Sequence, residues 1–190
     1  YFSYFAPGGN EIAIYRQPDD TLQISANGQN VQTVDPLPRD GNWHHIAVSF
    51  ELGEGFVDVW VDGERFGDSL DGFVFGGVAT HGIITLGVEQ DSLGGGFFAG
   101  EVLDGAIDDV AIWDSYLGDA AVLSLATSNT SSEAPVLTMR WDSAAGGFVN
   151  DASAVQITTQ GTLGTGDAFI PMAEDGSLVF RDFQIADGDG

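Results

Sequence analysis

Short apolar runs interrupted by glycine, aspartate, asparagine and proline make up most of this chain of 190 residues. In the run 57–62, VDVWVD, valine alternates with other residue types, which is the period of a strand with one buried face. Many short segments of this kind predict an all-β fold in which antiparallel strands form a two-sheet sandwich. We expect strands near residues 1–5, 11–16, 21–25, 30–34, 43–51, 56–62, 82–88, 96–99, 103–113, 136–141, 154–159 and 178–183, and one short helix at 118–126.

The composition indicates a folded acidic domain and excludes some partners. Hydrophobic residues make up 43% of the chain, so it can bury a substantial core despite a net charge of −24. Its five basic residues are all arginine. A surface of this charge repels nucleic acid and anionic membranes, and it attracts cations. We therefore expect salty, calcium-containing surroundings. The alternative is that the acidity serves solubility alone.

The sequence has no cysteine and no window of ~20 apolar residues that would span a bilayer. Disulfides are therefore excluded, and we expect no direct membrane insertion. The chain begins on a strand pattern, YFSYF, and ends on the polar sequence DGDG. We interpret it as one module of a longer chain, in contact with neighbouring modules.

The stretch 87–113, GVEQDSLGGGFFAGEVLDGAIDDVAIW, carries the most specific chemistry. Glu89, Gln90 and Asp91 follow an apolar strand, a glycine-rich bend comes next, and Glu101 adds another carboxylate on the return. Oxygen donors gathered in this way suit calcium, which takes about six to eight oxygen ligands. The stretch offers none of the cysteine or histidine that zinc or copper prefers. A solvated acidic hairpin is the alternative, and residue types alone favour it.

The same stretch resembles the calcium loop of the pentraxins, which runs from a strand through Glu-Gln-Asp-Ser and an apolar residue to Gly-Gly. Here the matching residues are 89–95, EQDSLGG, and VAIWD follows at 110–114. Over about residues 1–127 the pattern is also similar to laminin-G-like and concanavalin-A-like jelly rolls, as in NWHHIAVSF at 42–50. The resemblance implies a calcium-binding jelly roll.

The resemblance also implies the calcium ligands. For a first ion these are Asn10, Glu89, the backbone carbonyl of Gln90, and Asp91. A second ion would share Glu89 and Asp91 and add Glu101. However, Gly9 and Phe98 stand where pentraxins place carboxylates. Since two close divalent ions need several carboxylates to offset their repulsion, we expect one well-held Ca²⁺ and a second that is weak or absent.

Pentraxins bind phosphocholine or carbohydrate at their calcium face. The resemblance places the apolar wall of that ligand site at Tyr15, and more distant polar contacts at Ser25 and Asn30. A tyrosine there can stack on a sugar ring and still form a hydrogen bond. Ordinary packing on a strand is the alternative explanation for Tyr15.

The polar segment 129–135, NTSSEAP, breaks the chain. The residues after it resemble the opening strands of a laminin-G-like domain, which normally precede the position of Tyr1. We predict that 136–184 supply these strands to a single jelly roll covering 1–184, as in a circular permutation or an interrupted domain. The alternative is a jelly roll at 1–128 and the start of a second module at 136–190.

Signatures of catalysis are missing from the sequence. It contains neither the Glu-x-Asp-x-x-Glu strand of jelly-roll glycoside hydrolases nor a G-x-S-x-G turn or phosphate loop. His44 and His45 are adjacent on a predicted strand and face opposite sides, so they cannot share one metal.

We predict a non-catalytic, lectin-like module of a large secreted or surface bacterial adhesin, located outside the cell or on the bacterial cell surface. It would bind carbohydrate or another oxygen-rich ligand through calcium. The first alternative is a structural or protein-interaction spacer that calcium stabilises. A glycoside hydrolase is the least supported class.

Overall fold

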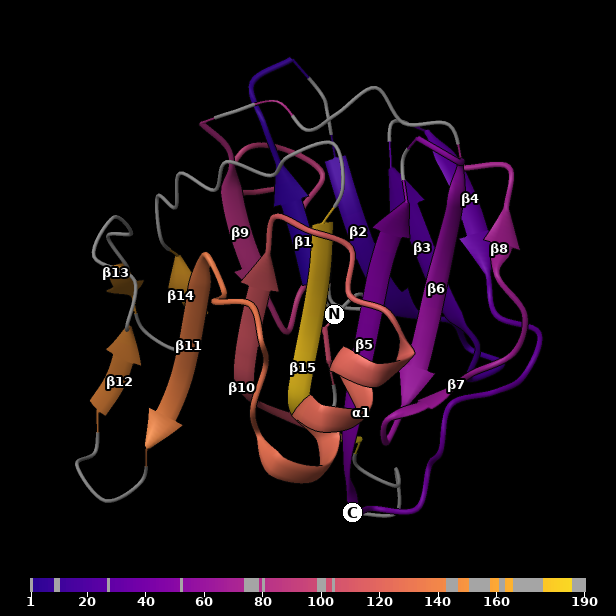
Figure 1. Ribbon diagram of the computed structural model, residues 1–190. Helices are drawn as coiled ribbons and strands as arrows, with labels where there is room; N and C mark the ends of the chain where they lie inside the picture. The colour runs from indigo at the N-terminus through magenta and orange to yellow at the C-terminus, as the bar shows by residue number, and fades with distance from the viewer. Residues whose placement is uncertain are drawn as a thin grey trace.

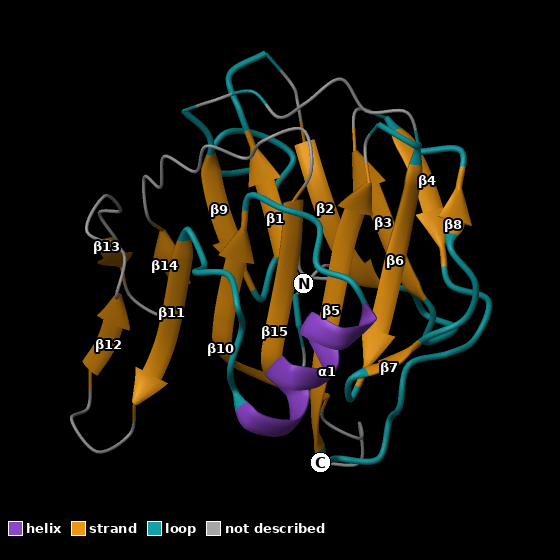
Figure 2. Ribbon diagram, viewed as in Figure 1, coloured by secondary structure: helices purple, strands orange, loops and turns teal. Residues whose placement is uncertain are grey.

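Two antiparallel sheets packed face to face form the body of the molecule, and one helix lies on the outer side of the larger sheet (Figures 1 and 2). The computed structural model describes residues 2–8, 11–26, 28–51, 53–73, 79, 81–98, 102–103, 105–142, 147–150, 158–160, 163–165 and 176–185. For residue 11 and from residue 140 on, it describes the backbone alone. The predicted antiparallel sandwich with one short helix is confirmed.

The smaller sheet is built from five strands in the order β4-β3-β2-β1-β9. These strands are β1 (Phe2–Phe5), β2 (Glu11–Arg16), β3 (Leu22–Ala26), β4 (Gln29–Gln32) and β9 (Ile83–Leu86). Burial alternates strictly along β3, with positions 22, 24 and 26 buried and 23 and 25 half-buried. The alternation read from the sequence therefore sets which face of this sheet meets the core.

The larger sheet follows the order β12-β11-β10-β15-β5-β6-β7, with β8 beside β6. Its strands are β5 (Trp43–Glu51), β6 (Phe56–Val61), β7 (Glu64–Arg65), β8 (Leu70–Asp71), β10 (Gly105–Trp113), β11 (Leu137–Asp142), β12 (Gly147–Asn150) and β15 (Gly176–Ile185). A separate pair is formed by β13 (Thr158–Gln160) and β14 (Leu163–Thr165). Strand β15 comes from the end of the chain, yet it lies between β10 and β5.

Apolar side chains fill the space between the two sheets. This main core includes Tyr4, Ile12 and Ile24 from the smaller sheet, and Val48 and Ile112 from the larger one. A second cluster lies on the other side of the larger sheet, where helix α1 (Asp119–Ser128) packs over β5, β6 and β10. Its members include the fully buried tryptophans Trp60 and Trp113. The helix thus covers the outer face of the larger sheet and does not cover the outer face of the smaller sheet.

One local expectation differs from the structure. Residues 96–98 form no strand, so the predicted strand at 96–99 is wrong over its described part. Gly96 has a φ of 75°, which turns the chain out of an extended path. Inside β10, Asp109 has a φ of 51° and its backbone N–H donates to the Asp108 carboxylate at 2.8 Å, while the register with β15 is the same on either side of it. Among the described residues, no helix has the length and apolar character needed to cross a bilayer.

Candidate functional site

A row of side chains crosses the outer face of the smaller sheet from one edge strand to the other. The paired positions are Thr85 on β9, Ser3 on β1, Ala13 on β2, Ser25 on β3 and Asn30 on β4. Their neighbours along each strand point into the core, so these residues point away from it. The row connects the hairpin after β9 with two predicted ligand residues, Ser25 and Asn30.

The hairpin after β9 folds back over the first two positions of this row. Ser3 is 0% exposed and Thr85 is 2% exposed, although both lie on the outer face. The Thr85 hydroxyl donates to the carbonyl of Val88 at 2.9 Å, and the backbone N–H of Gln90 donates to the Ser3 hydroxyl at 3.4 Å. The hairpin therefore lies on the same face of the sheet as Ser25 and Asn30.

The buried side chain of Gln90 anchors the hairpin. Its Nε2 donates to the carbonyl oxygens of Ser3 at 3.2 Å and Ile83 at 2.7 Å, while its Oε1 accepts from the Gly94 N–H at 3.0 Å. Gln90 is 0% exposed. The sequence comparison assigned Gln90 a role through its backbone carbonyl. It missed the side chain, because nothing local indicates that an amide after a strand will turn inward.

Glycines set the shape of the bend. Ser92 and Gly95 exchange two backbone hydrogen bonds, of 3.2 and 2.9 Å, around the two-residue turn at 93–94. Gly94 has a φ of 67°, a conformation that L side chains rarely adopt. At Gly96, a Cβ atom would lie 2.8 Å from the Cβ of Asp91, so only glycine fits there without displacing Asp91.

The structure describes the side chains of two predicted carboxylate ligands on this hairpin, Glu89 and Asp91. Glu89 is buried, at 8% exposed, and Asp91 is exposed. Asn10 and Glu101 lie outside the described residues, so the full predicted set stays a prediction. Within the described ranges, no group of three or more histidine, aspartate or glutamate side chains is gathered for a metal. The donors that are described, Glu89, Asp91 and the backbone of Gln90, are all oxygens, which fits calcium.

The predicted ligand residues belong to a connected network on β2, β3 and β4. Gln23 Nε2 donates to the Tyr15 hydroxyl and, at 3.2 Å, to the Ser25 hydroxyl. Gln23 Oε1 accepts from Gln17 Nε2 at 2.6 Å, and Ser25 in turn donates to Asn30 Oδ1 at 2.6 Å. We call these five residues, Tyr15, Gln17, Gln23, Ser25 and Asn30, the amide ladder. The structure thus brings the three predicted ligand residues together and adds two glutamines.

The two glutamines were missed by sequence reasoning, although a signal for one of them is present. Gln23 and Ser25 occupy the polar positions of an alternating strand, a pattern that indicates the outer face. What alternation does not give is the pairing of Gln23 with Tyr15, which the β2–β3 register sets.

The hairpin segment 93–102 carries several exposed apolar side chains. Four of the large apolar side chains that are exposed in the described residues lie here: Leu93, Phe97, Phe98 and Val102. Phe98 stands where the family resemblance would place a carboxylate, and more than half of its surface faces solvent. Exposed large apolar side chains close together along the chain and beside carboxylates suit contact with another molecule.

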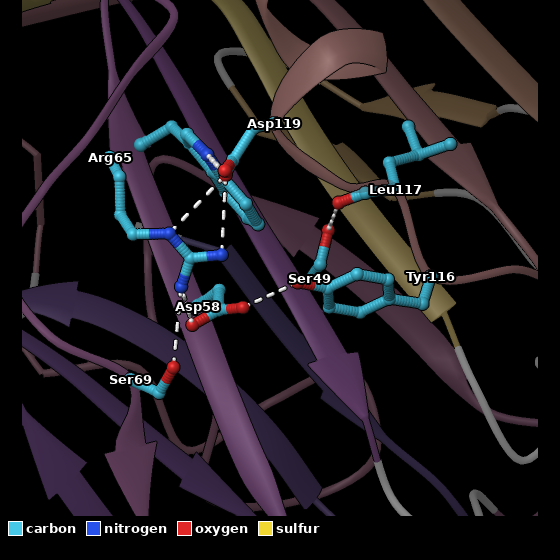
Figure 3. A network of polar contacts seen from close by, with 8 residues as sticks. Ser49, Asp58, Arg65, Ser69, Tyr116, Leu117 and Asp119 are labelled. Atoms are coloured by element: carbon cyan, nitrogen blue, oxygen red, sulfur yellow. Dashed lines mark hydrogen bonds and ion pairs between the residues drawn. The ribbon is translucent and has the colours of Figure 1, made fainter.

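A second polar network lies on the opposite side of the sandwich, under α1 (Figure 3). Arg65 forms an ion pair with the buried Asp58, and its guanidinium also contacts Asp119 at 3.2 Å. The Tyr116 hydroxyl donates to Asp58, and Trp60 Nε1 donates to Asp119 at 2.9 Å. Burial and the neighbouring Asp58 raise the pKa of Tyr116 to about 12. This network ties the start of α1 to β6 and β7.

His44 links two loops. It belongs to no group of three or more possible metal ligands among the described residues. Its Nε2 lies 3.0 Å from Asp40 and its Nδ1 lies 2.9 Å from Asp62. Burial alone would lower the pKa of His44, but the hydrogen bonds to Asp40 and Asp62 outweigh it, and the pKa is raised. His45 is buried at the next position, so the two rings lie on opposite sides of β5, as predicted.

Comparison with known proteins identifies relatives of this fold and loop. A model described as the pentaxin family matches residues 1–150. The neuronal pentraxin receptor of Mus musculus is 36% identical over 127 residues, which is 66% of this chain and 25% of that protein. Neuronal pentraxin-1 of Homo sapiens is 33% identical over 130 residues, 68% of this chain and 30% of that protein. The chain therefore spans about a quarter to a third of these relatives.

Among solved structures, the chain is similar to a native heptameric SAP-like pentraxin from Limulus polyphemus. The TM-score is 0.57 at 21% identity, covering 88% of this chain and 75% of the other. This likeness supports the fold. The relatives are animal pentraxins and not bacterial adhesins, so the comparisons give no support to the predicted bacterial setting.

Proposed function

This chain belongs to the pentaxin family, and we propose that it is a non-catalytic, lectin-like module that binds an oxygen-rich ligand through calcium. One observation carries the proposal: the carboxylate hairpin and the amide ladder share the outer face of the smaller sheet. The β-sheet row from Thr85 to Asn30 places them there, and Gln90 fixes the hairpin over β1. The proposed metal ligands Glu89 and Asp91 and the proposed ligand contacts therefore belong to the same face of the sheet.

We assign the metal site to Asn10, Glu89, Gln90, Asp91 and Glu101, with one calcium ion held well. Glu89 and Asp91 supply charge, the backbone of Gln90 supplies a neutral oxygen, and Asn10 and Glu101 complete the set. Calcium with open coordination positions accepts hydroxyl or phosphate oxygens from a ligand. The buried amide of Gln90 supports this assignment, because it anchors the hairpin that carries Glu89 and Asp91.

The ligand contacts are assigned to Tyr15, Ser25 and Asn30. The exposed apolar side chains of the segment 93–102 support a role in contact with another molecule, because large apolar side chains are usually buried. An extracellular location is part of the proposal, and membership of the pentaxin family supports it. The assignment to a bacterial surface protein rests only on the acidic composition without lysine or cysteine.

We also propose that residues 1–184 form one jelly roll. The position of β15 between β10 and β5 supports this arrangement, since a sheet without β15 would have a gap between those strands. The strand comes from the segment 136–184 that the sequence assigned to the same domain.

Thermal unfolding in excess calcium and in a chelator tests the metal. At a calcium concentration about 100 times the dissociation constant, binding stabilises the folded state by about 2.7 kcal/mol, and we expect the Tm to rise by roughly 5–10 °C. Asp91→Asn should remove most of this shift, while Asp114→Asn, an exposed aspartate outside the hairpin, should leave it unchanged. An identical Tm in calcium and in chelator would contradict the calcium site.

Binding to a panel of immobilised glycans, with and without chelator, tests the ligand. The proposal expects binding in calcium that the chelator abolishes. A Tm shift without any glycan binding would instead favour the calcium-stabilised spacer.

A further inference from the structure

The segment that follows α1 contains a motif that the candidate calcium site does not use. Residues 129–131, Asn-Thr-Ser, match Asn-x-Ser/Thr with a middle residue other than proline, which is the acceptor sequence for N-linked glycans in secreted proteins. The chain has six asparagines, and none of the other five is followed two positions later by serine or threonine. The motif therefore singles out Asn129 as the acceptor that this sequence offers. Because three residues also match by chance, the surroundings of Asn129 decide whether it suits a glycan.

Asn129 lies on the surface, and the fold uses its backbone alone. It is exposed and forms the C-cap of α1, with a φ of 55° and a ψ of 34°. Asparagine is one of the few L residues that adopt this left-handed conformation readily. Its backbone N–H donates to the Leu125 carbonyl at 3.1 Å. Among the described residues, no hydrogen bond engages its carboxamide. A sugar on Nδ2 therefore breaks no contact of the folded chain.

The neighbours of Asn129 are small hydroxyl side chains that satisfy one another. The Thr130 hydroxyl lies 3.1 Å from that of Ser124 and 2.8 Å from that of Ser128. Ser131 Oγ accepts from the backbone N–H of Glu133 at 3.1 Å. None of these contacts needs the Asn129 side chain, and no bulky side chain adjoins it in sequence. The segment leaves room for a large polar substituent.

The charge around the motif is exceptional for this protein. Residues 120–132 contain no ionisable side chain, although the chain has a net charge of −24. The oligosaccharide donor for N-glycosylation is linked to lipid through a pyrophosphate and is therefore anionic. Carboxylates beside the acceptor would repel it. The neutral stretch removes this repulsion at the one place where the motif occurs.

The position of α1 separates Asn129 from the candidate calcium site. The helix packs on the outer side of the larger sheet, over β5, β6 and β10 (Figure 1). The hairpin that carries Glu89 and Asp91 lies on the outer face of the smaller sheet, against β1. Both sheets lie between the two positions. A glycan on Asn129 therefore leaves the calcium face open to its own ligand.

We propose that Asn129 is an N-glycosylation site, so that this module carries an oligosaccharide on the side opposite the candidate calcium site. In the transfer, a bond forms between Asn129 Nδ2 and C1 of the first sugar of a lipid-pyrophosphate-linked oligosaccharide. The bond from C1 to the pyrophosphate oxygen breaks, the lipid pyrophosphate leaves, and one Nδ2 proton is released. The inference goes beyond the proposed function and takes from it only the extracellular location.

Expression in cultured animal cells, with a cleavable secretion signal before residue 1, tests the site. We expect a protein heavier than the 20.0 kDa polypeptide by the mass of one oligosaccharide. Peptide N-glycosidase should return it to the polypeptide mass and leave aspartate at position 129, which peptide mass spectrometry reads directly. Secreted and cell-retained fractions are both analysed. A mass that the glycosidase does not change in either fraction would overturn the proposal.

Variants locate the glycan. Asn129→Gly keeps a residue that accepts the left-handed C-cap, and Ser131→Ala keeps the asparagine but removes the hydroxyl of the motif. Both should lose the glycan completely, whereas Ser131→Thr should retain it, which rules out simple disruption of the segment. Asn42→Gln, at an exposed asparagine outside any such motif, is the matched control and should be glycosylated as the parent is. A glycan that persists in Asn129→Gly would contradict the assignment.

A calcium melt of the same proteins separates this inference from the proposed function. We expect the calcium-induced rise in Tm to be equal in the glycosylated parent and in Asn129→Gly, since the two positions lie on opposite sides of the sandwich. An unglycosylated parent that keeps the rise in Tm sinks this inference alone. A glycosylated parent without that rise sinks the calcium site and leaves the glycan in place.

Discussion

Replacing Gln90 with leucine tests whether this amide holds the candidate site together. The substitution keeps a side chain of similar volume but removes the three side-chain hydrogen bonds, to Ser3, Ile83 and Gly94. A hydrogen bond of this kind contributes about 1 kcal/mol net, and a buried group left without a partner costs about 1–3 kcal/mol. Gly94 lies at the half-buried rim, where water replaces the lost amide. The Ser3 carbonyl has no such access. We therefore expect a loss of about 3 kcal/mol in the free energy of unfolding.

Urea unfolding followed by tryptophan fluorescence measures this loss, with and without calcium. Gln32→Leu is the matched control, because Gln32 is exposed and loses a single side-chain hydrogen bond, to Thr21, so its replacement should change stability by no more than about 1 kcal/mol. Calcium titration of both variants gives the second readout. A freed hairpin no longer holds Glu89 and Asp91 in position, so we expect calcium affinity to fall at least about tenfold in Gln90→Leu. Parent-like stability and affinity in Gln90→Leu would refute the anchoring role.

Three further predictions follow from the geometry. Asp58→Asn should lower the free energy of unfolding by about 2 kcal/mol, less than for a fully buried ion pair because the Arg65 side chain is 35% exposed, whereas Asp119→Asn should cost under about 1 kcal/mol by urea unfolding. The pKa of His44 is raised in the folded state, so His44 stabilises the fold fully below its unfolded pKa of about 6.5. This stabilisation is lost as the pH rises through the folded pKa. Unfolding followed from pH 5.5 to 8.5 should show this pH dependence in the parent protein and not in His44→Gln. Gly96→Ala should weaken calcium binding in a titration, because the added Cβ displaces Asp91. Gly67→Ala is the control: Gly67 has a φ of 80° but open space around its Cβ position, so backbone strain should lower its Tm while its calcium affinity stays unchanged.

Most strands and the helix followed from the order of apolar and polar residues. The alternation at 57–62 became β6, and the apolar crowding at 118–126 became α1, which runs two residues further, to Ser128. Local periodicity predicts such elements because apolar residues favour buried positions and polar residues favour exposed ones, so the spacing of residue types reflects the geometry of the strand or helix. The strand expected at 96–99 failed because Gly96 turns the chain and the side chains of Phe97 and Phe98 face solvent.

The candidate site was only partly readable from the sequence. Residue types gave the oxygen donors of Glu89 and Asp91, and the family resemblance gave Tyr15, Ser25 and Asn30. Neither gave the link between them. The amide of Gln90, the two glutamines of the ladder and the Arg65 network under α1 depend on partners that are distant along the chain.

By itself, the sequence determined the alternation that builds the strands, the glycines that shape the bend, and the acidic composition that favours a divalent cation. Only the tertiary structure decided that the hairpin lies over β1, on the same face as the amide ladder, and that β15 enters the larger sheet between β10 and β5. The reason is physical. The preference of a residue for burial or exposure is a property of that residue alone and can be read from the sequence. The contact of Gln90 with Ser3 spans 87 positions and exists only once β9 has paired with β1.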